Sequence, residues 1–191
     1  YNVPVGRYRF GIALSPDEKT VYVANVGMYE YSLVKRRKNG EWKNGTIDFP
    51  AAAYGTKQSE EGIHSDSLEI PGLGPVNTDE SFSVWSVSLQ KNNKPRAVAK
   101  IKTGNLVGQM VEDFPAVGGS SPNSIVAGDR YMFISNGNND NITVLDARKN
   151  KIVKHIKLSP DQRLAKYRGV IPFGLDISPD GKTVYVTESG L

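Results

Sequence analysis

Apolar and polar side chains alternate in two similar stretches near the two ends of the chain. Residues 9–25 read RFGIALSPDEKTVYVAN and residues 172–188 read PFGLDISPDGKTVYVTE, with ten of the seventeen aligned positions identical. In each stretch, two alternating runs flank a turn in which Pro presets φ and Asp bonds its own backbone. Each stretch therefore predicts a β-hairpin.

A third copy of the hairpin pattern lies between the first two. It reads PNSIVAGDRYMFISN over residues 122–136 and has a shorter turn. Two more apolar runs follow this copy, and a matching pair follows the first copy after an interruption at residues 27–81. These additional strands are predicted at 141–146 and 151–158, and at 85–89 and 97–104. The repeating unit therefore has four strands.

Repeated four-stranded antiparallel units of about 40 residues predict a β-propeller. A β-sandwich would not repeat its own sequence, and nothing outside the repeats shows sustained helical periodicity. We therefore predict an all-β fold: a partial β-propeller of about 2.5 four-stranded antiparallel blades, with a long loop insertion at 27–81.

The chain is predicted to be a single partial propeller. Residues 1–6 are expected to be the last strand of a preceding blade, because residues 3–6 (VPVG) match residues 101–104 (IKTG). The predicted blades are 7–104 and 121–158, followed by half a blade at 172–191. Unpaired strand edges are templates for association. We therefore expect the remainder of a longer propeller, or identical chains, to cover the open edges; a stable open monomer is the alternative.

Several of these segments resemble a known family. TVYVAN, TVYVTE, the SPDGK turn and ITVLD are similar to the YVTN-repeat propellers of surface-layer and secreted bacterial proteins. The resemblance covers about two thirds of the chain and excludes most of 27–81. It implies a bacterial protein located in the periplasm, at the cell surface or in the medium. Leu89 departs from the repeat, which usually has Asp there, as at Asp146.

A narrower resemblance concerns the first hairpin and the interruption after it. VGRYRFGIALSPDEKTVYVANVGMYEYSLV, followed by a long insertion, is similar to the propeller half of proteins that carry a C-terminal alkaline-phosphatase-like phosphoesterase domain. That resemblance implies a propeller that guides anionic substrates to a catalytic domain. No such domain is present in these 191 residues.

Strand direction sorts the connections onto two faces of the propeller. The long connections at 27–81, 104–120 and 159–171 share one face, and the short turns share the other. Long loops held by rigid strands are where binding residues concentrate. The loop-rich face is therefore the predicted binding surface.

Two short motifs with cationic and aromatic side chains lie in connections between blades on this face. Residues 7–9 read Arg-Tyr-Arg and residues 166–168 read Lys-Tyr-Arg. Arg forks suit carboxylate or phosphate, so the motifs are interpreted as a rim for an anionic ligand; the alternative is ordinary solvated charge. The candidate residues of this rim are Arg7, Tyr8, Arg9, Tyr167 and Arg168.

The insertion contributes two further candidate ligand-binding residues, Trp42 and His64. Trp42 follows a basic run at Lys35–Lys38, although residues 27–81 as a whole carry six basic and nine acidic residues. A nucleic-acid surface would interleave aromatics over a basic face, so we expect no nucleic-acid binding. The alternative is a solvated hairpin tip. An anionic ligand or a cell-surface polymer is the expected partner.

The inventory of catalytic groups is thin. The chain has no Cys and only two His residues, so thiol chemistry is excluded. EEGIHSD, residues 60–66, has metal-capable atoms without a usual ligand spacing, and no G-x-S-x-G motif is present. We predict no catalytic residue, metal or cofactor. The formal charge of +4 is too small to indicate nucleic acid, and no stretch is long enough for a membrane helix.

Three functions remain from the sequence. The first is a non-catalytic extracytoplasmic scaffold that binds or assembles through its loop-rich face. The second is the propeller half of a secreted phosphoesterase. The third is a lactonase-like propeller enzyme, which would place acidic and His residues at the channel mouth, where this sequence has cations.

Overall fold

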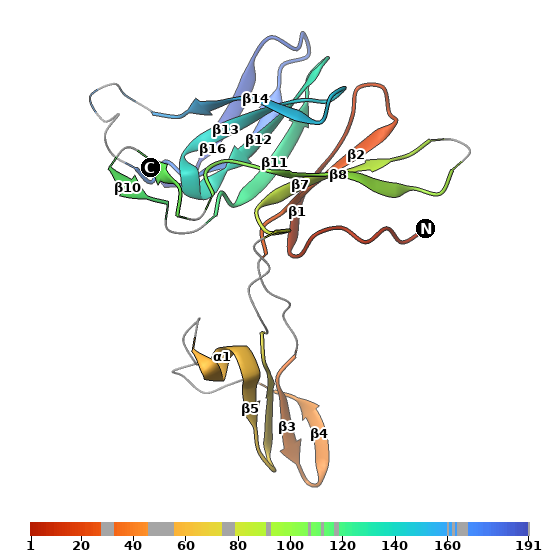
Figure 1. Cartoon of the computed structure of the whole chain (residues 1–191), viewed down its shortest axis with the longest axis vertical. Coiled ribbons are helices and arrows are strands. Elements are labelled where there is room, and N and C mark those ends of the chain that lie inside the picture. Colours follow the sequence, from red (N-terminus) through yellow and green to blue (C-terminus); the bar gives the residue numbers. More distant parts are fainter. Residues whose placement is uncertain are drawn as a thin grey trace. The chain divides into compact units, whose positions relative to one another are not determined.

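The alternating repeats fold as the sequence predicts, into an all-β partial propeller with four-stranded antiparallel blades (Figure 1). The computed structural model describes residues 1–27, 33–45, 56–73, 79–90, 93–106, 108–111, 113–116, 119–159, 161, 163 and 168–190. Two compact units are present: the propeller unit, Tyr1–Gly27 with Asp79–Leu191, and the insertion unit, Met28–Thr78.

Each blade is a meander in which neighbouring strands are also neighbours in space. Blade 1 consists of β1 (Arg9–Leu14), β2 (Thr20–Asn25), β7 (Ser83–Ser88) and β8 (Arg96–Lys102). Blade 2 consists of β11 (Pro122–Ala127), β12 (Tyr131–Asn136), β13 (Asn141–Asp146) and β14 (Lys151–Lys157), with a 3₁₀ turn at Gly137–Asn139. The half-blade consists of β15 (Pro172–Ile177) and β16 (Val184–Glu188).

We call the first strand of each blade (β1, β11 and β15) its inner strand. The residue before each inner strand has a backbone conformation in the left-handed region, which is uncommon for residues other than glycine. These residues are Tyr8, Ser121 and Ile171, with φ of 52°, 52° and 50°. In blade 1, the Tyr8 carbonyl accepts a hydrogen bond from the Val26 N–H at 3.0 Å, and the Arg7 carbonyl accepts one from Gly27 at 3.1 Å. This pair of bonds, which we call the clamp, ties the start of the inner strand to the residues after the second strand.

The clamp recurs in the other two hairpins with nearly the same lengths. The equivalent bonds run from Gly137 to Ser121 (3.0 Å), Asn138 to Ser120 (3.2 Å), Ser189 to Ile171 (3.1 Å) and Gly190 to Val170 (3.2 Å). The repeat seen in the side chains is therefore also a repeat of backbone conformation.

A β-bulge follows the clamp in every inner strand. The register places two residues of the inner strand opposite one residue of the second strand. The bulged pairs are Phe10 and Gly11 opposite Ala24, Asn123 and Ser124 opposite Ser135, and Phe173 and Gly174 opposite Thr187. A bulge re-aims the local side chains and increases the strand twist, so each inner strand turns at the same point.

A hydroxyl on the second strand stabilises the bulge in blade 2 and in the half-blade. Ser135 Oγ accepts from the Ser124 N–H at 2.9 Å and donates to the Phe173 carbonyl at 2.7 Å. Thr187 Oγ1 accepts from the Gly174 N–H at 2.8 Å. The Ser135 hydroxyl therefore joins the inner strands of two successive blades.

In blade 1, the residue opposite the bulge is Ala24, which has no hydroxyl, and the bulge residue Gly11 lies close to the inner strand of blade 2. A Cβ at Gly11 would lie 2.3 Å from the Asn123 carbonyl oxygen. No side chain larger than hydrogen fits at that distance, so the glycine permits β1 and β11 to approach closely.

The hydrophobic core lies between blades 1 and 2. It consists of Tyr22, Ala24 and Val84 from blade 1 and Ile125, Met132, Ile134 and Leu145 from blade 2. The Tyr22 hydroxyl is hydrogen-bonded to the Ala147 carbonyl at 2.9 Å and to Asn150 Oδ1 at 3.1 Å, in the turn between β13 and β14. Burial raises the pKa of Tyr22 to about 12, so the phenol stays neutral in the core. The buried neutral phenol stabilises the fold below about pH 10, the ordinary pKa of Tyr. That stabilisation is lost as the pH rises from about 10 toward 12.

Tyr185 occupies the position in the half-blade that Tyr22 occupies in blade 1. Tyr22 has no exposed surface, whereas Tyr185 is 60% exposed. Within the described residues, β16 pairs with β15 alone, while β2 and β12 each pair on both sides. Tyr185 is therefore the same kind of residue that packs between blades at Tyr22, but here its side chain is largely exposed.

The insertion is folded, where the sequence predicted a loop. Its sheet has the order β4-β3-β6-β5, built from β3 (Lys35–Lys38), β4 (Glu41–Asn44), β5 (Gly62–His64) and β6 (Leu68–Pro71), with the short helix α1 (Lys57–Glu61) before β5. Strands of three or four residues are too short to show a period, which is why the sequence pattern missed them. The connection after β8 likewise contains a small ribbon of β9 (Met110–Val111) and β10 (Phe114–Pro115).

The remaining segments add two observations. Residues 1–6 lie outside every strand of the described structure, so their assignment to a preceding blade stays a prediction. No helix in the described part of the chain has the length and apolar character needed to cross a membrane.

The Tyr22 contact gives a first prediction. Replacing Tyr22 with Phe removes the hydroxyl and leaves the Ala147 carbonyl without that donor, so the free energy of unfolding should fall by about 1 kcal/mol. Tyr185→Phe is the matched control at the equivalent, exposed position and should change stability by less than about 0.5 kcal/mol. Urea unfolding followed by circular dichroism measures both; equal effects would show that the Tyr22 hydroxyl contributes nothing.

The bulge hydroxyl gives a second prediction. Ser135→Ala leaves the Ser124 N–H and the Phe173 carbonyl unpaired and should destabilise the fold by about 1–3 kcal/mol. Ser86 is the control, because it is equally buried and its hydroxyl has no partner among the described residues. Ser86→Ala should be neutral or slightly stabilising. A Ser135→Ala variant as stable as Ser86→Ala in thermal unfolding would contradict this role.

Candidate functional site

The first two strands of the insertion sheet form a hairpin with a two-residue loop. Asn39 and Gly40 connect β3 to β4, with φ of 53° and 84°. Positive φ at both positions is typical of the tight turn that matches the twist of a hairpin, and Asn-Gly is its preferred sequence. The dipeptide is the signal from which this hairpin could have been predicted.

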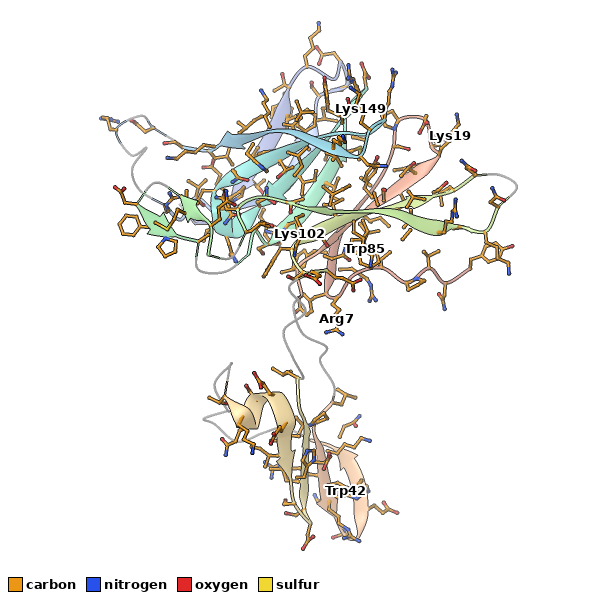
Figure 2. The ribbon with its side chains drawn as sticks, viewed as in Figure 1. Arg7, Lys19, Trp42, Trp85, Lys102 and Lys149 are labelled. Atoms are coloured by element: carbon orange, nitrogen blue, oxygen red, sulfur yellow. The ribbon has the colours of Figure 1, made fainter. Side chains whose placement is uncertain are left out.

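One face of the hairpin carries an exposed indole among cations. The register pairs Lys35 with Asn44 and Arg37 with Trp42, and directly paired residues point to the same side of a sheet. All four are exposed, and Trp42 is 46% exposed. Figure 2 labels Trp42 on this hairpin. We call this surface the Trp42 face; its hairpin residues include no acid.

The opposite face of the hairpin is also charged, and it contains the hairpin's acid. Its residues are Arg36, Lys38, Glu41 and Lys43. Lys43 Nζ lies 3.2 Å from Glu41 Oε2, with both side chains exposed. The two faces therefore differ in chemistry, although both contain cations.

The Trp42 face continues across the sheet to His64. Lys35 pairs with Glu69, and Glu69 pairs with His64. The structure thus places two residues that the sequence nominated separately, Trp42 and His64, on one face of one sheet. Only the strand pairing could show this, because 22 positions separate them in the sequence.

Both ring nitrogens of His64 are bonded to acceptors. Nδ1 lies 2.7 Å from Glu69 Oε1, and Nε2 lies 3.1 Å from the Glu61 carbonyl oxygen. An imidazole can donate from both nitrogens only when it is protonated. The hydrogen bond to Glu69, with a smaller effect from the Glu61 carbonyl, accordingly raises the pKa of His64 above its ordinary value.

This arrangement leaves His64 without a nitrogen directed at a metal. Among the residues that the structure describes, no group of three or more His, Asp or Glu side chains could hold a metal ion. At His64, the ring nitrogens therefore make contacts within the insertion unit, to Glu69 of β6 and to the last residue of α1.

The cationic rim is partly described. Arg7 is half-buried, Tyr8 is 58% exposed, and Arg9 and Arg168 are exposed. Tyr167 lies outside the described residues. Figure 2 labels Arg7 in the propeller unit. Because Arg7 and Tyr8 supply the two carbonyls of the clamp, their backbone has a structural role whatever their side chains bind.

The clamp provides a reference point for comparing the connections that carry the two rim motifs. Tyr8 and Ile171 occupy equivalent positions, each in the left-handed region before an inner strand. Counting back three residues from each, Arg168 corresponds to Val5 rather than to Arg9. The motifs thus lie in equivalent connections between blades but not at equivalent positions.

The three bulges line a cavity of about 230 Å³ at the inner strands. Phe10 and Phe173 meet edge to face over it, with ring centroids 5.7 Å apart and an interplanar angle of 87°. The lining residues are Phe10, Gly11, Ile12, Asn123, Ser124, Ile125, Phe173 and Gly174. The sequence did not predict this cavity, because its lining residues come from the inner strands of three separate repeats.

Comparison with known proteins assigns no family. No family model and no curated protein matches the sequence. Solved structures that resemble the fold include Kuenenia stuttgartiensis hydrazine synthase, with 17% identity, a TM-score of 0.47, and coverage of 95% of this chain and 29% of that chain. The chain covers less than two thirds of the structures it resembles.

Two other solved structures show the same pattern. A protein of unknown function from Desulfotomaculum acetoxidans has 13% identity and a TM-score of 0.39, with 95% of this chain and 49% of that chain covered. A protein described as a 6-phosphogluconolactonase, from Bacteroides fragilis, has 13% identity and a TM-score of 0.40, with 93% and 49% covered. With TM-scores below 0.5, these matches assign no function.

The contacts of His64 give a prediction. Glu69→Gln removes the carboxylate that stabilises the imidazolium, so the pKa of His64 should fall toward its ordinary value. NMR titration of the imidazole resonances measures it, with His155, in the propeller unit, as the internal control. In the unmodified protein, the interaction stabilises the fold below the ordinary His pKa and is lost as the pH rises through the raised pKa. An unchanged His64 pKa in the variant would contradict the assigned contact.

Proposed function

We propose that this chain is a non-catalytic binding scaffold that works outside the cytoplasm. The propeller blades form the frame, and the insertion unit carries the surface that meets a partner. The observation that carries this proposal is the Trp42 face, where an exposed indole lies among cations on a folded sheet. Trp42 is 46% exposed, and an indole with that much accessible surface beside an arginine offers a ring on which a partner can stack.

The chain leaves the propeller unit and returns to it at residues whose backbone is hydrogen-bonded within the blade. On the entering side, the clamp fixes Val26 and Gly27 to the start of β1. On the returning side, Ser83 pairs with Asn25, and the Phe82 carbonyl accepts the Thr103 N–H at 3.1 Å. A long connection that leaves a rigid sheet from fixed backbone is the usual arrangement of binding elements on a scaffold.

The edge of β16, which pairs only with β15 among the described residues, supports assembly as a second part of the proposal. An unpaired strand edge accepts another strand, and Tyr185 presents the side chain that is buried between blades at Tyr22. The strand would come from the remainder of a longer propeller or from an identical chain. The extracytoplasmic location rests on the resemblance to YVTN-repeat proteins.

The scaffold proposal predicts that the insertion can be removed without unfolding the blades. Replacing residues 28–78 with a short Gly-Ser linker should keep the circular dichroism spectrum of the strands and shift the melting temperature by only a few degrees, because the core of blades 1 and 2 is untouched. Cosedimentation with purified bacterial cell envelopes should fall from clear binding by the full chain to background. The proposal is wrong if the shortened chain binds as well as the full chain, or if the full chain does not bind.

A further inference from the structure

The hairpin concentrates positive charge within a unit that is acidic overall. Residues 35–44 contain five cations and one acid, whereas residues 27–81 contain six basic and nine acidic residues. The single acid, Glu41, lies on the face opposite Trp42. Two of the five cations, Lys35 and Arg37, lie on the Trp42 face beside the indole. What distinguishes this face from the opposite one is therefore the pairing of a cation with an exposed indole, which suits an anionic partner that also has a flat ring.

Arg37 and Trp42 form the recognition pair on this surface. They are directly opposite across two strands, so their Cβ atoms lie about 4.5–5.5 Å apart. Arg37 Nε donates to the Gly40 carbonyl at 3.2 Å, which orients the guanidinium. Among the described residues, the hydrogen bond to Gly40 uses Nε and leaves the terminal amino groups of Arg37 able to bind a ligand. A guanidinium binds a carboxylate through two parallel hydrogen bonds.

We infer that the Trp42 face binds an acidic polysaccharide whose sugar rings carry carboxylates, an inference that rests on the proposed function. The apolar face of one sugar ring stacks on the Trp42 indole. The carboxylate attached to the same ring, or to the next one, accepts from Arg37. Lys35, on the same face, lies opposite the carboxylate of Glu69 on the neighbouring strand, so Arg37 supplies the main charge contact. Asn44 offers neutral hydrogen bonding at the edge of the sheet.

Other anionic macromolecules fit the surface less well. A nucleic acid spreads its phosphates over a wide basic surface and stacks successive bases on several aromatics, but this face has one aromatic and the rest of the unit is acidic. A membrane would require apolar side chains at the hairpin tip, where the chain has Asn39 and Gly40. A polymer that combines a stackable ring with a carboxylate matches the pair that is present.

Titration calorimetry of the full chain with oligogalacturonate tests this inference. The fully methyl-esterified oligomer is the ligand control, because it has the same rings without charge. Trp42→Ala and Arg37→Gln should each weaken binding by about tenfold or more, and the ester should bind at least tenfold more weakly than the acid. Lys38→Gln removes one cation from the opposite face and should change the affinity by less than twofold.

Each remaining outcome overturns the inference. Equal losses for Arg37→Gln and Lys38→Gln would show binding by net charge without a specific face. Tighter binding of a DNA duplex, or of vesicles containing phosphatidylglycerol, would assign the surface to a different partner. If the full chain cosediments with cell envelopes and loses that binding when residues 28–78 are removed, but does not bind oligogalacturonate, the scaffold proposal stands and this inference falls.

Discussion

The left-handed residue before each inner strand is the constraint on which the blades depend. Holding Tyr8, Ser121 and Ile171 near φ of 50° is unfavourable by about 1–2 kcal/mol for each residue. The two clamp hydrogen bonds in each hairpin contribute about 1–3 kcal/mol together, which is enough to offset that cost. The clamp sets where each inner strand starts, so the bulge two residues later always falls at the same level of the propeller.

Polar side chains then join one blade to the next. The carboxylate of Asp140, at the end of the 3₁₀ turn in blade 2, accepts from the Gly169 N–H at 2.7 Å and the Ile171 N–H at 2.9 Å. It thereby orients the left-handed residue that begins the half-blade. The Tyr22 and Ser135 hydroxyls make corresponding contacts between successive blades. Apolar packing between flat sheets is tolerant of sliding, whereas these directional bonds define one arrangement.

Internal repetition made the blades predictable from the sequence. The alternation around residues 9–25, 122–136 and 172–188 located all three hairpins because the same pattern of apolar and polar residues recurs in each of them. The clamps and bulges could not be predicted in this way, because they are features of backbone conformation. The left-handed clamp position, for example, is Tyr8, Ser121 or Ile171 in the three hairpins, so it has no common residue type. The cavity that the bulges line at the inner strands could not be predicted for the same reason.

The insertion was harder to predict for a different reason. Its strands are three or four residues long and charged on both faces of β3 and β4, so hydrophobic alternation is absent. Trp42 and His64 could be nominated as binding residues by type, but placing them on one face required the pairing of four strands whose sequence order differs from their spatial order.

The central claim is that the insertion binds while the blades serve as a frame. Hydrogen–deuterium exchange of the full chain, with and without oligogalacturonate, tests it most directly. The account predicts slower exchange of amides within residues 35–44 on binding, and unchanged exchange at the clamp amides of Val26, Gly137 and Ser189. Protection centred on the inner strands, with residues 35–44 unaffected, would contradict it and would place binding at the blades.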